Sequence, residues 1–456
     1  MLRLRNSGIN MTEGQPLKLL LAFALPMLVG NVFQQLYSAV DSIVVGKFNG
    51  SGALGAIGCT GTVTFLFFSI SNGIGSGCGV VTSQYFGAGK NDRVKQALAN
   101  SAYIMLSAGI LMSVIAYAAA PSVLKIMKTP ADLMPDAVTY IRVNCIGVPL
   151  VAVYNYSASM ERAMGDSVTP LYFLMLSCAI NILLDLFFVC VLDLSVFGAA
   201  LATILSQMIA GIGCLYTAWK QNLLFHLSRG DFAPDPVVLK RAIKIGLPMA
   251  MQWSMIAVST SLLQTYVNSF DSQAVSAYTM TSRVEQLAHQ PYGSLGSALS
   301  TYAGQNIGAG RPDRVKKGVK QSALLMLGFT LVMTVVMQLC SGTFMRIFLD
   351  EAEGADVIAL AARGMRILSL FFVALGGIYI TRSTLNGAGD VGITLVNGFV
   401  ELGCRLLIPL LMNLIPGVGV WGIWWTAGLA WLGSCLFCIL RYLVWMRKGT
   451  QHTRIN

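Results

Sequence analysis

Long apolar runs recur along this chain of 456 residues, separated by short polar breaks. Each run reaches about the 20 residues that an α-helix needs to cross a ~30 Å hydrocarbon core. The runs do not alternate in polarity as the shorter strands of a membrane barrel would. The pattern therefore predicts an all-α polytopic membrane protein with twelve transmembrane helices, at about residues 17–46, 53–84, 96–120, 134–158, 168–191, 196–219, 241–269, 274–305, 319–342, 357–385, 392–413 and 419–445.

The second half of the chain repeats landmarks of the first in the same order. The segment SQYFGAGKNDRVK begins at Ser83, and the similar segment GQNIGAGRPDRVK begins at Gly304. Each half also has one Leu-Pro pair early in its first span and one Gly-Asp pair later. The repeat predicts two pseudo-symmetric six-helix lobes, an N-terminal lobe at 1–219 and a C-terminal lobe at 240–456, joined by a cytoplasmic linker at 220–239.

Composition and charge support a membrane location. Only 11% of the residues are charged and 55% are hydrophobic, with a mean hydropathy of +0.67, whereas soluble domains carry about 25% charged residues. With twelve spans, the basic clusters fall on the side of the N-terminus. This asymmetry predicts a multi-pass protein of the cell inner (plasma) membrane with both termini in the cytoplasm. No basic patch with interleaved aromatics indicates nucleic-acid binding. The 10 cysteines and 3 histidines show no metal-binding spacing.

Two aspartates, Asp41 and Asp185, lie inside apolar runs. A carboxylate at membrane depth costs about 2.5–3.5 kcal/mol on insertion scales, so it usually faces a cavity or a partner. Asn181 precedes Asp185 by one helical turn and shares its face, and Thr203 lies in the next span. These four residues predict a cation- or proton-binding site. Its oxygens suit a proton or Na⁺, and the sequence does not separate the two ions.

The two aspartates have no acidic counterpart in the repeat. The equivalent positions are close to Leu262 and Pro409. A carboxylate that only capped a kink or bonded a neighbouring helix would more plausibly recur in both halves. The asymmetry therefore favours a task confined to the N-terminal lobe.

Other polar groups lie in spans of the second half. Glu401 and Arg405 are one turn apart and are most simply an internal ion pair. Glu285 and His289 also share a helix face, either lining a substrate path or satisfying each other. The segment Gly87-Ala-Gly-Lys90 is not a nucleotide-binding loop, because the residues that such a loop requires are absent from their positions. With no ATP site and no cofactor expected, transport would depend on an ion gradient.

In these features the chain resembles the multidrug and toxic-compound extrusion (MATE) family, in its bacterial DinF-like or a neighbouring branch. The resemblance rests on the two six-helix halves, the paired Leu-Pro helices, the twin Gln-x-x-Gly-Ala-Gly turns and the Gly-Asp turns. It implies an ion site in the N-terminal lobe and a bend of the first helix at Pro26. The family's other pattern, acidic residues in the seventh and tenth spans, is absent. The residues that the resemblance and the helix spacing place along the substrate path are Gln34, Tyr37 and Tyr140.

The sequence thus predicts a secondary active antiporter, monomeric and not an enzyme, that exports organic, cationic and amphipathic compounds in exchange for H⁺ or Na⁺. Its partners would be the small-molecule substrate and the lipid bilayer. The alternative is a flippase for a lipid-linked precursor of the same broader superfamily, which would favour a large cavity lined with arginine. Only Arg382 and Arg405 are placed to line such a cavity.

Overall fold

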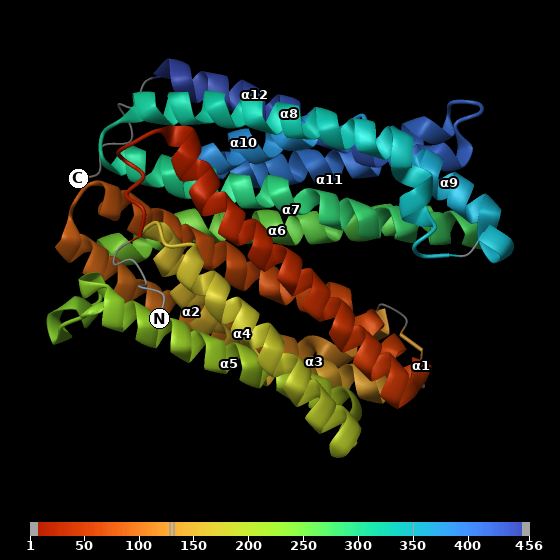
Figure 1. Cartoon of the computed structure of the whole chain (residues 1–456), viewed down its shortest axis with the longest axis horizontal. Helices are drawn as coiled ribbons and strands as arrows, with labels where there is room; N and C mark the ends of the chain where they lie inside the picture. Colours follow the sequence, from red (N-terminus) through yellow and green to blue (C-terminus); the bar gives the residue numbers. More distant parts are fainter. Residues whose placement is uncertain (1–7, 127–128, 131–132, 350, 449–456) are drawn as a thin grey trace. The chain divides into compact units, whose positions relative to one another are not determined.

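The computed structural model describes residues 8–126, 129–130, 133–349 and 351–448, and within these it does not describe the side chains of 36–59, 61–68, 126, 351–353 and 448. Every regular element in this part of the chain is helical (Figure 1). The elements are α1 (Pro16–Gly87), α2 (Asn91–Ile126), α3 (Met134–Ala163), α4 (Val168–Asp185), η1 (Leu186–Val191), α5 (Ser195–Gln221), η2 (Leu223–Phe225), η3 (Arg229–Phe232), α6 (Pro236–Val267), α7 (Ser272–Gly308), α8 (Pro312–Met345), α9 (Glu351–Ser369), α10 (Phe372–Ala388), α11 (Gly392–Asn413), η4 (Gly419–Trp421) and α12 (Gly422–Lys448).

Eight helices in the described part are long and apolar enough to cross a membrane. α9 and α10 pass the same test of length and composition as a pair and would make a ninth crossing; they are bent by 47° at the break between Ser369 and Phe372. The sequence predicted one span at 357–385, which this bent pair covers; the position of the bend was not predicted. α6 and α7 fall outside the eight because they contain more polar residues.

The first two predicted spans lie in a single run of helix. α1 is 72 residues long, and a straight helix of that length would measure about 108 Å, more than three times the thickness of a hydrocarbon core. Both predicted spans, 17–46 and 53–84, therefore lie within α1, and the chain turns back between its red first part and its orange second part (Figure 1). Pro26 and Pro248 lie inside α1 and α6, as the sequence predicted.

The repeat is visible in the turns that end the helices. The turn after α1 contains Gly89 with φ of +68°, and the turn after α7 contains Gly310 with φ of +69°. In each turn the residue after this glycine donates its N–H to a carbonyl five residues earlier, from Lys90 to Tyr85 at 3.2 Å and from Arg311 to Asn306 at 2.8 Å. Glycine adopts this left-handed conformation without a steric cost, which explains why both turns contain it.

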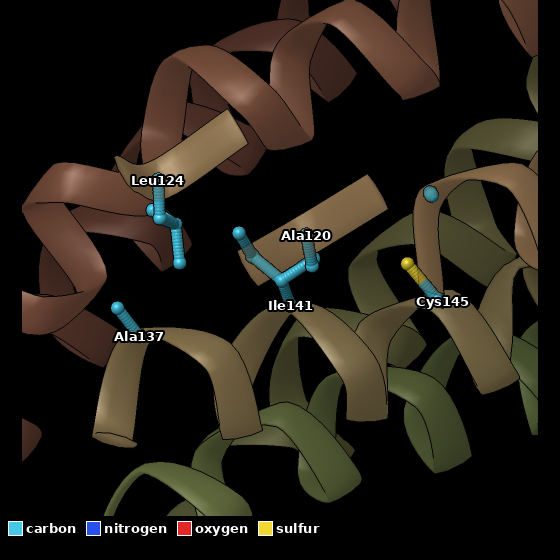
Figure 2. Close-up of a cluster of buried hydrophobic side chains, with 6 residues drawn as sticks. Ala120, Leu124, Ala137, Ile141 and Cys145 are labelled. Atoms are coloured by element: carbon cyan, nitrogen blue, oxygen red, sulfur yellow. The ribbon is translucent and has the colours of Figure 1, made fainter. Parts of the chain in front are cut away.

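Small side chains bring α2 and α3 together. Ala116, Ala120 and Leu124 of α2 pack on Ala137, Ile141 and Cys145 of α3, and all six are almost fully buried (Figure 2). In a bilayer, where lipid tails are as apolar as leucine, such small residues allow the close van der Waals packing that holds helices together.

The chain forms two compact units. As far as the residues are described, the first comprises those within Met1–Glu13 and Ala22–Ala250, and the second those within Gly14–Leu21 and Met251–Asn456. Within the first unit, α1 approaches α6 through small residues at both helix surfaces. A Cβ added to Gly77 would lie 2.3 Å from the Cα of Gly246, and one added to Gly73 would lie 2.3 Å from the Cα of Ala250. The glycines of the second predicted span therefore serve close helix packing.

Candidate functional site

The polar group predicted in the N-terminal half lies where regular helix ends. Asp185 is the last residue of α4, and the six residues after it form the π-helix η1. π-helical turns interrupt the usual backbone ladder and occur frequently at functional sites. Asp185 itself is 0% exposed. A fully buried carboxylate beside a distorted helix has the features of a binding group.

Asn181 and Thr203 lie beside this carboxylate. With its amide oriented to suit both neighbours, Asn181 donates from Nδ2 to Oδ2 of Asp185 at 2.9 Å and accepts at Oδ1 from the backbone N–H of Thr203 at 3.2 Å. The Thr203 hydroxyl lies 3.4 Å from the same amide group. Asn181 and Asp185 belong to α4, and Thr203 belongs to α5. The structure thus brings three of the four predicted ion-site residues together.

The other predicted residues have varied positions. The side chains of Asp41 and Tyr37 lie outside the described residues. Gln34 is exposed on α1, and Pro26 is half-buried within the same helix. Tyr140 of α3 is partly buried against Val189, Val196 and Ala199, which belong to η1 and α5. Tyr140 therefore packs against the π-helix that follows Asp185.

The chemistry of this group suits a small, hard cation. A carboxylate, an amide and a hydroxyl offer oxygen ligands for a metal ion such as Na⁺, and the carboxylate also takes a proton. Within the described part of the chain, no cluster of three or more His, Cys, Asp or Glu residues could hold a transition metal.

A second buried polar group lies in the C-terminal half. Glu401 and Arg405 of α11 form the predicted internal ion pair, with Oε1 and Nη2 3.0 Å apart and side chains only 7% and 6% exposed. On α7, Glu285 Oε1 lies 3.5 Å from Nε2 of His289. The His289 ring contacts the rings of Tyr379 and Trp431, at centroid distances of 6.4 Å and 5.4 Å. Residues far apart in sequence thus meet within one unit.

One buried carboxylate was missed by the sequence reasoning. Glu161 of α3 is 4% exposed, and its Oε2 accepts from the thiol of Cys214 on α5 at 3.0 Å. A glutamate at the end of an apolar span, just before a Gly-Asp turn, could have revealed it. Because Arg162 follows it directly, Glu161 looks in the sequence like one of the charged residues that commonly occur at the end of a helix.

An apolar pocket of about 530 Å³ lies elsewhere in the first unit. It is lined mainly by aromatic side chains, including Tyr156, Trp219 and Phe225. None of the polar residues described above lines it, so it does not coincide with the ion-site candidate.

Comparisons with known proteins agree with this architecture. The MatE family model matches residues 26–187 and 245–410, one segment in each half. The chain is similar to the probable multidrug resistance protein YpnP of Bacillus subtilis, with 27% identity over 434 residues that cover 94% of this chain and 96% of the relative. It is also similar to the probable multidrug resistance protein NorM of Thermotoga maritima, with 23% identity over 416 residues, covering 89% and 88%.

The fold matches that of solved structures. The crystal structure of MATE in the bent conformation superimposes with a TM-score of 0.88 at 20% identity, covering 96% of this chain and 98% of that one. This likeness and the helical content confirm the predicted fold, an all-α membrane protein with twelve transmembrane helices in two lobes. Since the family model covers well over half of its residues, the chain belongs to the MatE family, whose members are membrane transporters and not enzymes.

Proposed function

We propose that this protein is a secondary active antiporter that exports organic, cationic and amphipathic compounds in exchange for H⁺ or Na⁺. The observation that carries the proposal is the buried group of Asn181, Asp185 and Thr203 at the junction of α4 and η1. The proteins to which this chain is similar add support, since several are named multidrug resistance or multidrug export proteins. Export of several unrelated drugs is the function that those names indicate.

The buried carboxylate supplies the coupling. Removing a charged carboxylate from water is costly unless a cation or several donors compensate it. Binding of H⁺ or Na⁺ at Asp185 changes which hydrogen bonds Asn181 makes, and so changes the packing where η1 meets Tyr140 of α3. For the ion to drive transport, it must bind one conformation more tightly than the other. Asp41 of α1 would share the ion.

The proposal extends to location and assembly. The bacterial relatives point to the plasma membrane. We place both termini in the cytoplasm, on the grounds of the charge asymmetry of the loops. The transporter would work as a monomer, with the lipid bilayer and the small-molecule substrate as its partners.

Purified protein in liposomes with separately imposed pH and Na⁺ gradients tests this proposal. Efflux of a cationic dye is followed by fluorescence for the wild type and for Asp185→Asn and Asp41→Asn. The matched control is Asp193→Asn, a few residues further along the chain. Asp193 is exposed, and its φ of +52° is a conformation that asparagine also tolerates.

Both site variants should lose gradient-driven efflux while they fold normally, and the control should keep it. The gradient that supports efflux identifies the ion. Full antiport by Asp185→Asn would remove this carboxylate from the mechanism. Movement of a lipid-linked probe without efflux of soluble dyes would favour the flippase alternative.

A further inference from the structure

The second unit contains a group of ionisable residues, three of them buried and two half-buried, for which the ion-coupled mechanism has no use. We call it the C-terminal polar cluster, and it consists of Glu285 and His289 of α7, Arg382 of α10, and Glu401 and Arg405 of α11. Arg405 and Glu401 act electrostatically on Glu285, and Arg382 and Arg405 act on His289. The five residues therefore form one electrostatic unit.

Arg405 has more hydrogen-bond donors than the protein uses. Its side chain is 6% exposed, and Nη2 pairs with Glu401 at 3.0 Å. Nε and Nη1 have no acceptor among the described residues. A buried donor without a partner costs about 1–3 kcal/mol, and more when it is charged. An arginine kept in this state indicates that another acceptor binds there.

Two neighbours increase the surplus of donors. Arg382 is 8% exposed, lies 5.1 Å from the centroid of the Tyr379 ring, and has no carboxylate within ion-pair distance among the residues described. Asn397 lies on the same face of α11 as Glu401 and Arg405. Its Oδ1 accepts from Ser434 at 2.9 Å, but its Nδ2 has no acceptor in the described structure.

Aromatic rings lie beside these donors. Trp431 of α12 and Tyr379 of α10 both contact the ring of His289. A flat organic molecule could stack on such rings while its acidic group meets the guanidinium groups. The combination of spare donors and rings is that of a small-molecule site, in which a few polar groups orient a largely apolar ligand.

We propose that the C-terminal polar cluster binds the carboxylate of an aromatic substrate, with Arg405 and Arg382 as the donors. The inference rests on the proposed export function and narrows its substrate class, from cations to compounds that also carry an acidic group. A carboxylate would accept from the unused N–H groups of Arg405. The competing interpretation is a purely structural ion pair, which needs no ligand.

The test uses a rhodamine that carries a free carboxylate and the methyl ester of the same rhodamine. Binding of each dye to the purified protein is measured by fluorescence anisotropy in nanodiscs of phosphatidylcholine alone. The variants are Arg382→Gln, Arg405→Lys, and the double variant E401Q/R405Q, which removes both charges of the pair and so avoids leaving one buried alone. The matched control is D390N/R441Q, which removes an ion pair of 2.8 Å elsewhere in the same unit.

The wild type should bind the acid more tightly than the ester. E401Q/R405Q and Arg382→Gln should each raise Kd for the acid at least tenfold and change Kd for the ester less than twofold, and Arg405→Lys should give an intermediate loss. D390N/R441Q should change neither. Equal losses for acid and ester, or no loss, would overturn the proposal and leave the cluster structural.

Two further arms separate the sources of failure. Anionic phospholipid added to the nanodiscs should not displace the acid dye, and displacement would make a lipid headgroup the occupant and overturn a substrate site. Dye efflux from liposomes is measured in parallel. Absence of efflux of both dyes by the wild type contradicts the export function, whereas efflux without discrimination by the variants contradicts only this inference.

Discussion

The buried ion pair of α11 permits a quantitative prediction about stability. The perturbation is a double-mutant cycle of Glu401→Gln, Arg405→Gln and both together. Single replacements leave a charge buried without its partner, whereas the double replacement leaves two neutral side chains. We expect Arg405→Gln to destabilise the protein most, Glu401→Gln less, and the double variant least.

The magnitude follows from the geometry. At 3.0 Å and an effective dielectric constant of about 20, two unit charges attract with about 5.5 kcal/mol. Loss of one partner of a buried pair typically costs about 3–5 kcal/mol. Arg405→Gln should reach the upper end of that range because it leaves both Glu401 and Glu285 without their nearby positive charge. Glu401→Gln leaves Arg405 close to Glu285, so its cost should fall at the lower end.

The assay is reversible unfolding in mixed micelles, followed by tryptophan fluorescence, with the free energy of unfolding compared across the cycle. The pair Asp390–Arg441 provides the comparison. Its atoms are as close, at 2.8 Å, but its side chains are 31% exposed for Arg441 and 21% for Asp390. Partly solvated pairs contribute about 0.2–1 kcal/mol, so its single variants should cost little.

Additive losses in the Glu401–Arg405 cycle would refute the reasoning, because they would mean that the two charges do not compensate each other. An equally small cost for both ion pairs would show that the interior of the second unit is well hydrated. Either result would also weaken the case that Arg405 keeps unsatisfied donors for a ligand.

Three further predictions concern other parts of the chain. Gly77→Leu should destabilise the first unit by at least about 2 kcal/mol, because an added Cβ lies 2.3 Å from backbone at Gly246. Gly328→Ala, inside α8 and with nothing within 4 Å of the added Cβ, should not lower the stability in the same unfolding assay, because alanine favours helix more than glycine does. Asn181→Leu should retain the fold but slow gradient-driven dye efflux more than tenfold, since Asp185 loses a donor at 2.9 Å, and wild-type rates would contradict the site. At Asp235 burial opposes the charged form, but the N–H groups of Val237 and Val238 and the Arg93 guanidinium outweigh it and lower the pKa. The stability that this carboxylate contributes is therefore present above its unfolded pKa of about 3.9 and is lost as pH falls through the lower folded pKa. Amide hydrogen exchange at the start of α6 should increase only below about pH 4. In Asp235→Ala the same exchange should already be fast at pH 7.

The fold was largely predictable because membrane helices follow from length and hydropathy alone. The twin turns at Gly89 and Gly310 were predictable too, since a left-handed residue favours glycine in both copies. The break between α9 and α10 was not, because it follows no proline or glycine and the apolar run continues across it. Only packing within the unit shows where that span bends.

The site was predictable where its residues lie on one helix. Asn181 and Asp185, or Glu401 and Arg405, are one turn apart, so the sequence alone places them together. Contacts between distant helices were beyond that reasoning. The pairing of Glu161 with Cys214, and the meeting of His289 with Trp431, depend on how α3, α5, α7 and α12 pack.

In both halves the regular backbone hydrogen bonding of one helix is interrupted, but the charges beside the interruption differ. α4 changes to π-helix directly after Asp185. In the repeat its equivalent is α11, which contains Pro409 at the matching position. Proline cannot donate to the carbonyl four residues earlier, so this helix also lacks a regular backbone bond there. An interrupted hydrogen-bond ladder at this position is thus common to the two halves.

The charges on the two equivalent helices differ in the way that the two proposals require. In the first unit the distorted helix carries an amide and a carboxylate, a set of oxygens that attracts a cation. In the second unit the equivalent helix, α11, carries Glu401 and Arg405. The Arg405 guanidinium has N–H groups without an acceptor among the described residues. If both proposals hold, exchanging Asp185 for a neutral residue will abolish ion dependence and leave acid-dye binding intact. The E401Q/R405Q variant will do the reverse. Loss of both properties in either variant would show instead that the two polar groups do not act independently.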